Sequence, residues 1–130
     1  MTTRASVLVV LTSLLLAPLS LTAPAAHAAW TTQQTVDGAR LLICKQPRGD
    51  GRIRVKARLD NRRADHTHLA GVSRTRGAQT TRIDFRTAAG RLSPTKSLVW
   101  RRGDTLVAGM GEPSGEGAGG DFVLRDVTRC

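Results

Sequence analysis

Arg52-Ile53-Arg54-Val55-Lys56-Ala57-Arg58-Leu59-Asp60 is the stretch that decides the fold, because charged and apolar residues alternate in it without interruption. Successive side chains of a β-strand point to opposite faces, so one face would carry Ile53, Val55, Ala57 and Leu59. The other face would carry Arg52, Arg54, Lys56 and Arg58. In a helix the same residues would be scattered around the circumference. The stretch therefore predicts one strand of an antiparallel sheet, with one buried face and one hydrated, basic face.

The first residues have the pattern of an export signal. Arg4 is followed by an apolar run over residues 6–21, and Ala26-His27-Ala28 supplies the small residues that signal peptidase requires. We expect residues 1–28 to be a cleaved signal peptide, and the mature chain to be secreted without a transmembrane segment. An uncleaved membrane anchor is the alternative, but two prolines and the lack of a basic flank after Ala29 argue against it.

Residues 29–130 are enough for one domain with a small core. Loss of Arg4 lowers the formal charge of the chain by only one from +10, so the remaining part is strongly basic. Most of that charge is arginine. An arginine bias combined with many alanines and glycines is typical of GC-rich bacterial genomes, so the basic character has a compositional explanation as well as a functional one.

Cys44 and Cys130 are the two cysteines, and both lie in the part expected to be exported. An oxidising compartment favours a disulfide, and two cysteines allow one intramolecular pairing. That bond would close a loop spanning most of the domain and, by loop entropy, stabilise it by about 4–5 kcal/mol. A free thiol or an intermolecular bridge is the alternative.

Short apolar runs separated by turn residues continue to the end of the chain. We expect residues 29–38 to be a polar lead-in and residues 39–130 to form a single β domain. Expected strands lie at residues 39–46, 52–60, 69–74, 81–86, 96–101, 105–110 and 122–128. About seven strands at this spacing predict a small antiparallel β-sandwich with an immunoglobulin-like strand count and one disulfide; a small β-barrel is the alternative. The glycine-rich residues 111–120 are expected to be an irregular loop.

His66 and His68 are the histidines of the exported part, and side chains two apart in extended backbone share a face. Both could reach one metal ion, with Asp65 as a further oxygen ligand or as a partner of an imidazole. Structural zinc sites use four ligands and catalytic sites usually three, and we find no further histidine. These two residues are therefore weak candidates, and we expect no metal and no cofactor.

The residues that could act in catalysis are few. No serine lies in a Gly-x-Ser-x-Gly pattern. Ser114, Glu112 and Glu116 lie in the glycine-rich segment, whose composition is too mobile to hold catalytic geometry. We therefore expect no catalytic residues and a protein that is not an enzyme.

The basic face is the most conspicuous predicted surface. It carries Arg52, Arg54, Lys56 and Arg58. We expect further arginines to extend it: Arg62, Arg63, Arg74, Arg76, Arg82 and Arg86. Such a face attracts an anionic cell-envelope polymer or an acidic protein. Aromatic residues are too few for a base-stacking platform, so sequence-specific nucleic acid is not an expected partner. The alternative is that exposed strand positions must be polar and this genome fills them with arginine.

The sequence thus predicts a secreted, monomeric, non-catalytic binding module for anionic surfaces or macromolecules. A small inhibitor of an extracellular hydrolase is the alternative function, with residues 61–68 or 111–120 as the inhibitory loop. The third choice is a metal-dependent or other hydrolase.

Overall fold

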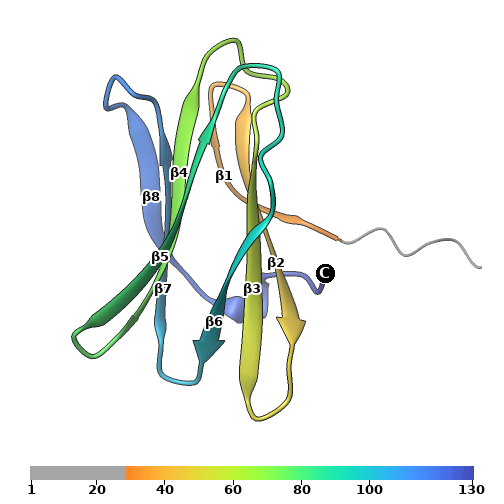
Figure 1. Cartoon of the computed structure of the whole chain (residues 1–130), viewed down its shortest axis with the longest axis vertical. Coiled ribbons are helices and arrows are strands. Elements are labelled where there is room, and N and C mark those ends of the chain that lie inside the picture. Colours follow the sequence, from red (N-terminus) through yellow and green to blue (C-terminus); the bar gives the residue numbers. More distant parts are fainter. Residues whose placement is uncertain (1–28) are drawn as a thin grey trace, which may run out of the picture.

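The computed structural model describes residues 29–130, which form eight β-strands and one short 3₁₀ helix (Figure 1). The expected signal peptide, residues 1–28, lies outside the described residues. The elements are β1 (Thr31–Val36), β2 (Ala39–Pro47), β3 (Arg52–Asp60), β4 (His68–Arg76), β5 (Gln79–Thr87), β6 (Lys96–Arg101), β7 (Thr105–Gly111), β8 (Gly117–Phe122) and η1 (Leu124–Asp126). Within residues 29–130, no helix has the length and apolar character needed to cross a membrane.

The strands form two four-stranded antiparallel sheets. The first sheet has the order β1-β2-β3-β6 and the second the order β5-β4-β7-β8. The chain passes between the sheets after β3, after β5 and after β6, so hairpins within a sheet alternate with crossings between them (Figure 1). The predicted all-β sandwich with one disulfide is confirmed, with eight strands in place of about seven.

The core lies between the sheets, and every second residue of β3 points into it. Val55, Ala57 and Leu59 are fully buried, as predicted for the dry face of this strand. From the second sheet Val72 and Ala108, also fully buried, belong to the same apolar cluster. Burial of such side chains, at about 25 cal/mol for each Å² of apolar surface, is the main force that holds the two sheets together.

β2 is buried on both faces, which its unbroken apolar run predicted. Leu41 and Ile43 belong to the core, and Cys44, fully buried, forms the predicted disulfide with Cys130. The last residues of the chain lie parallel to β2, because the Lys45 N–H donates to the Thr128 carbonyl at 2.9 Å and the Cys130 N–H donates to the Lys45 carbonyl at 3.0 Å. The disulfide therefore joins segments that already share hydrogen bonds.

Two segments expected to be irregular are edge strands. The lead-in at residues 29–38 contains β1, whose threonines and glutamines suit an edge with one exposed face. The glycine-rich segment contains β8, in which Gly117 pairs with Gly111. A Cβ at Gly117 would lie 2.6 Å from the Met110 carbonyl oxygen, so the glycines permit a close approach of β7 and β8.

The end of the chain also differs from the expectation. The strand predicted at residues 122–128 is absent there; β8 ends at Phe122 and the chain turns through η1. Leu124 and Val127 are nevertheless buried in the core, as their apolar character indicated. Residues 122–127 thus place apolar side chains in the core but do not continue the strand. The chain turns here, and its last residue reaches Cys44, to which the disulfide joins it.

Candidate functional site

The predicted basic face lies on the outside of the first sheet. β3 is an inner strand between β2 and β6, so its outward residues occupy the middle of that face. Lys56 stands between Cys44 and Ser97, and Arg54 between Gln46 and Val99. The four predicted residues, Arg52, Arg54, Lys56 and Arg58, are all partly exposed.

The charges on this face differ in how they are neutralised. Arg52 forms an ion pair with Asp50 at 2.6 Å. The Arg58 guanidinium lies over the Trp30 ring, 4.2 Å from its centroid, which fixes this side chain without neutralising it. Arg54, Lys56 and Arg58 have no carboxylate within ion-pair distance among residues 29–130. These three residues keep their charge available to an anionic partner.

Four of the arginines expected to extend the face lie in the other sheet, so that part of the prediction is wrong. Arg74, Arg76, Arg82 and Arg86 belong to β4 and β5 of the second sheet. Arg74 and Arg76 pair with the buried Asp104 carboxylate, and Arg82 pairs with Asp84. The crossing from β3 to β4 moves the chain to the other sheet, which the spacing of strands in the sequence does not reveal. Arg62, in the connection itself, pairs with Asp60.

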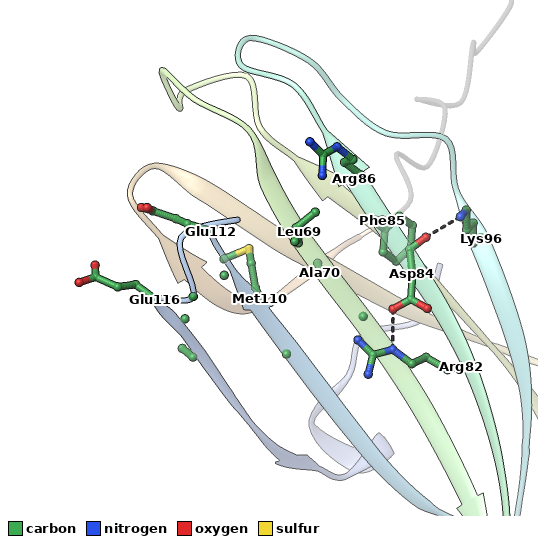
Figure 2. Close-up of a pocket in the computed structure, with 16 residues that line it drawn as sticks. Leu69, Ala70, Arg82, Asp84, Phe85, Arg86, Lys96, Met110, Glu112 and Glu116 are labelled. Atoms are coloured by element: carbon green, nitrogen blue, oxygen red, sulfur yellow. Dashed lines mark hydrogen bonds and ion pairs between the residues drawn. The ribbon is translucent and has the colours of Figure 1, made fainter.

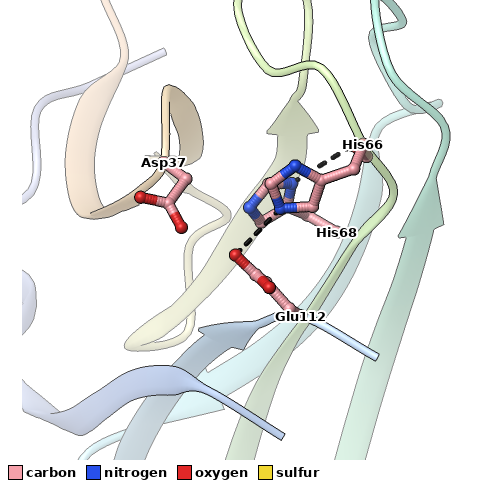
Figure 3. A group of neighbouring side chains, drawn as sticks. All are labelled: Asp37, His66, His68 and Glu112. Atoms are coloured by element: carbon pink, nitrogen blue, oxygen red, sulfur yellow. Dashed lines mark hydrogen bonds and ion pairs between the residues drawn. The ribbon is translucent and has the colours of Figure 1, made fainter. Parts of the chain in front are cut away.

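The two candidate histidines lie at the β3–β4 connection and do come together. His66 is partly exposed, whereas His68, the first residue of β4, is fully buried. Their ring centroids are 4.5 Å apart. Figure 3 shows the two imidazoles side by side, with the carboxylates of Asp37 and Glu112 facing them. The ligand atoms of these four side chains all lie within 4.8 Å of one another.

Asp37 reaches this cluster from the β1–β2 turn. Asp37 and Gly38 both have positive φ, 40° and 81°, which is the backbone of a tight hairpin turn and the reason for an Asp-Gly pair there. The turn packs closely on the β3–β4 connection, since a Cβ at Gly38 would lie 2.7 Å from the Arg63 carbonyl oxygen. A larger residue in place of Gly38 would push Asp37 away from the histidines.

Glu112 reaches the cluster from the β7–β8 turn. Its N–H donates to the Glu116 carbonyl at 2.7 Å, which closes the turn. Its carboxylate accepts a hydrogen bond from the Ser114 hydroxyl at 3.0 Å and lies 2.8 Å from His66 Nε2. Sequence composition indicated a mobile loop here, but the turn is hydrogen-bonded and the carboxylate is held from two sides.

The electrostatics of the cluster are those of closely spaced acids and bases. Hydrogen bonding to the Glu112 carboxyl, and then burial, raises the pKa of Asp37. Hydrogen bonds with Asp37, His66 and Ser114 hold the pKa of Glu112 at about 2. Hydrogen bonds to Asp65 and Glu112 raise the pKa of His66. Two carboxyl groups this close repel each other when both are ionised, unless a cation lies between them.

An open depression of about 870 Å³ lies beside the cluster on the second sheet (Figure 2). Gly109 leaves the sheet without a side chain there. The ion-paired side chains of Arg82 and Asp84 cover Gly71, where a Cβ would be 2.7 Å from Arg82 Nη2. Glu112 lines one end of the depression and also belongs to the cluster. Solvent therefore has access to the Glu112 side of the histidines.

No pattern in the sequence indicated that Asp37 or Glu112 would lie beside the histidines. Both carboxylates lie in hairpin turns, far along the chain from residue 66, and only the sandwich brings the three turns to one end. The Asp-Gly dipeptide at residues 37–38 was the available signal for the first turn.

Comparisons of the chain with family models, with curated proteins and with solved structures each found no match.

Proposed function

We propose that this protein is an exported, non-catalytic binding module that holds an anionic cell-envelope polymer on the outer face of its first sheet. Export rests on the Ala26-His27-Ala28 pattern and is supported by the Cys44–Cys130 disulfide, a bond that forms in oxidising compartments. The binding residues are Arg54, Lys56 and Arg58, with Arg52 at the edge of the same row.

One observation carries this proposal: three neighbouring cationic side chains on β3 lack carboxylate partners within residues 29–130. Other strongly basic positions, such as Arg62, Arg74 and Arg76, are paired with buried carboxylates and hold the fold together. A polyanion that displaces counterions from the unpaired residues gains free energy from the ions it releases.

The geometry suits a linear polymer better than a compact ligand. Along a strand, residues on the same face recur about every 6.4–6.8 Å, so the unpaired cations form a row that an extended polyanion can follow. Trp30 holds Arg58 in place by its ring, so less side-chain freedom is lost on binding. No base stacking is involved, and recognition depends on charge spacing.

The test is the salt dependence of binding to a soluble poly(glycerol phosphate). Affinity of the wild type should fall steeply with salt. Arg54→Gln/Lys56→Gln should reduce the magnitude of the slope of log K against log salt by about 1.4, roughly 0.7 for each lost phosphate contact. The matched control is Arg91→Gln/Arg102→Gln, which removes the same charge from two exposed turn positions. An equal reduction of the salt slope in the two double variants would mean that net charge alone drives binding, and the proposed face would be wrong.

A further inference from the structure

The cluster at the end of the sandwich has the composition of a metal site. Its residues take no part in the polymer binding proposed above. Its four side chains come from three places at one end of the sandwich: Asp37 from the β1–β2 turn, His66 and His68 from the β3–β4 connection and the first residue of β4, and Glu112 from the β7–β8 turn. Two imidazoles and two carboxylates are ligands for one divalent ion, whose charge two carboxylates would balance.

His68 supplies the strongest observation. It is 0% exposed, and its Nε2 has no hydrogen-bond partner among residues 29–130. Its Nδ1 lies 3.4 Å from the His66 carbonyl oxygen, which can only accept a hydrogen bond, so in the neutral ring the proton is on Nδ1. Nε2 then presents a bare lone pair in a buried position. Leaving such an acceptor unpaired costs free energy, and a metal ion at Nε2 would remove that cost.

His66 has the arrangement that metal-ligating histidines usually have. One ring nitrogen, Nδ1, is paired with the Asp65 carboxylate, and the other, Nε2, faces Glu112 at 2.8 Å. A carboxylate that accepts the Nδ1 proton fixes the ring and makes Nε2 a better ligand. Asp65 would thus act as a partner of the imidazole, and Glu112 would be a ligand beside it.

The two carboxylates, of Asp37 and Glu112, are placed so that one ion can be coordinated by both. Asp37 is exposed on its turn, whereas Glu112 is partly buried and is oriented by the Ser114 hydroxyl. Tetrahedral coordination with bonds of about 2.0–2.2 Å needs ligand atoms roughly 3.3–3.6 Å apart. The ligand atoms now lie within 4.8 Å of one another, so the side chains would draw together by about 1 Å on binding an ion. Asp37, exposed on its turn, has room for such a movement.

We propose that Asp37, His66, His68 and Glu112 bind one first-row transition-metal ion, with Zn²⁺ as the ion that best fits two imidazoles and two carboxylates. Calcium and magnesium prefer all-oxygen sites, and the two imidazoles select against them. The ion would join a turn of the first sheet to turns of the second, and so close this end of the sandwich.

The first experiment counts the metal. The full oxidised chain, stripped with a chelator and dialysed, is titrated with Zn²⁺ by calorimetry and thermal unfolding. One equivalent should bind with micromolar or tighter affinity, and the Tm should rise by at least about 5 °C in zinc excess, because the ion binds the folded chain. Millimolar Mg²⁺ or Ca²⁺ should give no shift. Less than a tenth of an equivalent of bound Zn²⁺ would overturn the proposal. The four side chains would then form a hydrogen-bonded network and no metal site.

The second experiment assigns the ligands. Asp37→Asn keeps a residue suited to the positive φ of the turn, and Glu112→Gln keeps the shape of the side chain, so both should fold. Each should weaken zinc binding at least tenfold. Glu116→Gln, a change of the same kind in the same β7–β8 turn, is the control and should bind as the wild type does. Zinc should also shift the His68 and His66 Nε2 resonances in long-range ¹H–¹⁵N spectra. Unchanged Nε2 shifts, or equal affinities in all three variants, would place the ion elsewhere.

Discussion

The Asn61 side chain holds His66 through the main chain: its Nδ2 donates to the His66 carbonyl oxygen at 2.8 Å. The same nitrogen donates to the Thr87 carbonyl at 2.9 Å, so one fully buried amide ties the β3–β4 connection to the end of β5. Since the His66 carbonyl also lies next to His68 Nδ1, Asn61 fixes the backbone on which the proton position of His68 depends.

Asn61→Ala should therefore destabilise the protein by about 2–3 kcal/mol, because it leaves two carbonyl oxygens without their donor in a buried site. Urea unfolding measures the change. Thr75→Ala, which removes an exposed hydrogen bond between side chains in the β4–β5 hairpin, is the control and should cost less than about 1 kcal/mol. A similar loss in the two variants would mean that the Asn61 amide does not organise the connection.

Gly38 and Gly49 provide a matched pair, because both have positive φ in hairpin turns, 81° and 73°. Nothing lies within 4 Å of a Cβ built at Gly49, whereas at Gly38 the Arg63 carbonyl oxygen is 2.7 Å away. Gly49→Ala should cost about 1 kcal/mol, which is the left-handed backbone penalty alone. Gly38→Ala should cost at least about 1–2 kcal/mol more, since the β1–β2 turn must move off its neighbour. Thermal unfolding of the two variants gives the difference directly; equal costs would contradict the close packing of this turn.

Asp60 should contribute to the acid sensitivity of the fold. Its side chain is 2% exposed and accepts hydrogen bonds from Arg62 at 2.9 and 3.0 Å and from Arg40 at 2.8 Å. The Arg62 hydrogen bonds, with those of Arg40, hold the pKa of Asp60 far below its usual value of 3.8, although burial opposes them. Because the folded pKa lies below the unfolded one, the stabilisation is complete above about pH 4 and is lost as the pH falls below that value.

Asp60→Asn should accordingly lower the free energy of unfolding at pH 7 by roughly 2–4 kcal/mol, the cost of breaking a buried ion pair. It should also flatten the fall in stability between pH 5 and pH 2, as measured by urea unfolding at several pH values. Asp50→Asn breaks an exposed pair with Arg52 and should change stability by less than about 1 kcal/mol. A variant at Asp60 with an unaltered pH profile would show that this pair does not govern acid stability.

Local sequence patterns predicted the interior of the fold better than its edges. The alternation in β3 and the apolar run in β2 each placed their residues on the correct face, because burial on one or both sides leaves a direct mark on composition. β1 and β8 leave no such mark, since an edge strand can be polar, as at Thr32, or bare, as at Gly119. Pairing with a neighbour stabilises these segments, and pairing is a property of the whole sheet.

The cluster was only half predictable for the same reason. His66 and His68 are two residues apart, so their proximity follows from extended backbone alone. Asp37 and Glu112 approach them only because the first and second sheets face each other and place three turns at one end. The basic face of β3 shows the opposite error. Arginines of β4 and β5, which are near β3 in the sequence, were expected on this face but lie in the other sheet.

The disulfide should matter most for the end of the chain and for overall stability. It links positions 86 residues apart, and in the loop-entropy account such a bond stabilises by about 4–5 kcal/mol, although many measured values are lower. Cys44→Ala/Cys130→Ala should lower the free energy of unfolding by about 3–5 kcal/mol in urea. Alanine is the appropriate replacement because Cys44 is fully buried and serine would bury an unpaired hydroxyl there.

The same variant separates global from local effects. The hydrogen bonds that hold residues 128–130 along β2, from the Lys45 N–H to Thr128 and from the Cys130 N–H to Lys45, remain possible without the bond. Near-native amide exchange at Lys45 below the unfolding transition would then indicate that the disulfide acts mainly on the unfolded chain. Fast exchange at Lys45, together with normal protection at Val55 in the core, would instead mean that the covalent bond is needed to dock the C-terminal segment. Reduction of the wild type with a thiol should reproduce the result of the double substitution, which controls for the lost sulfur atoms.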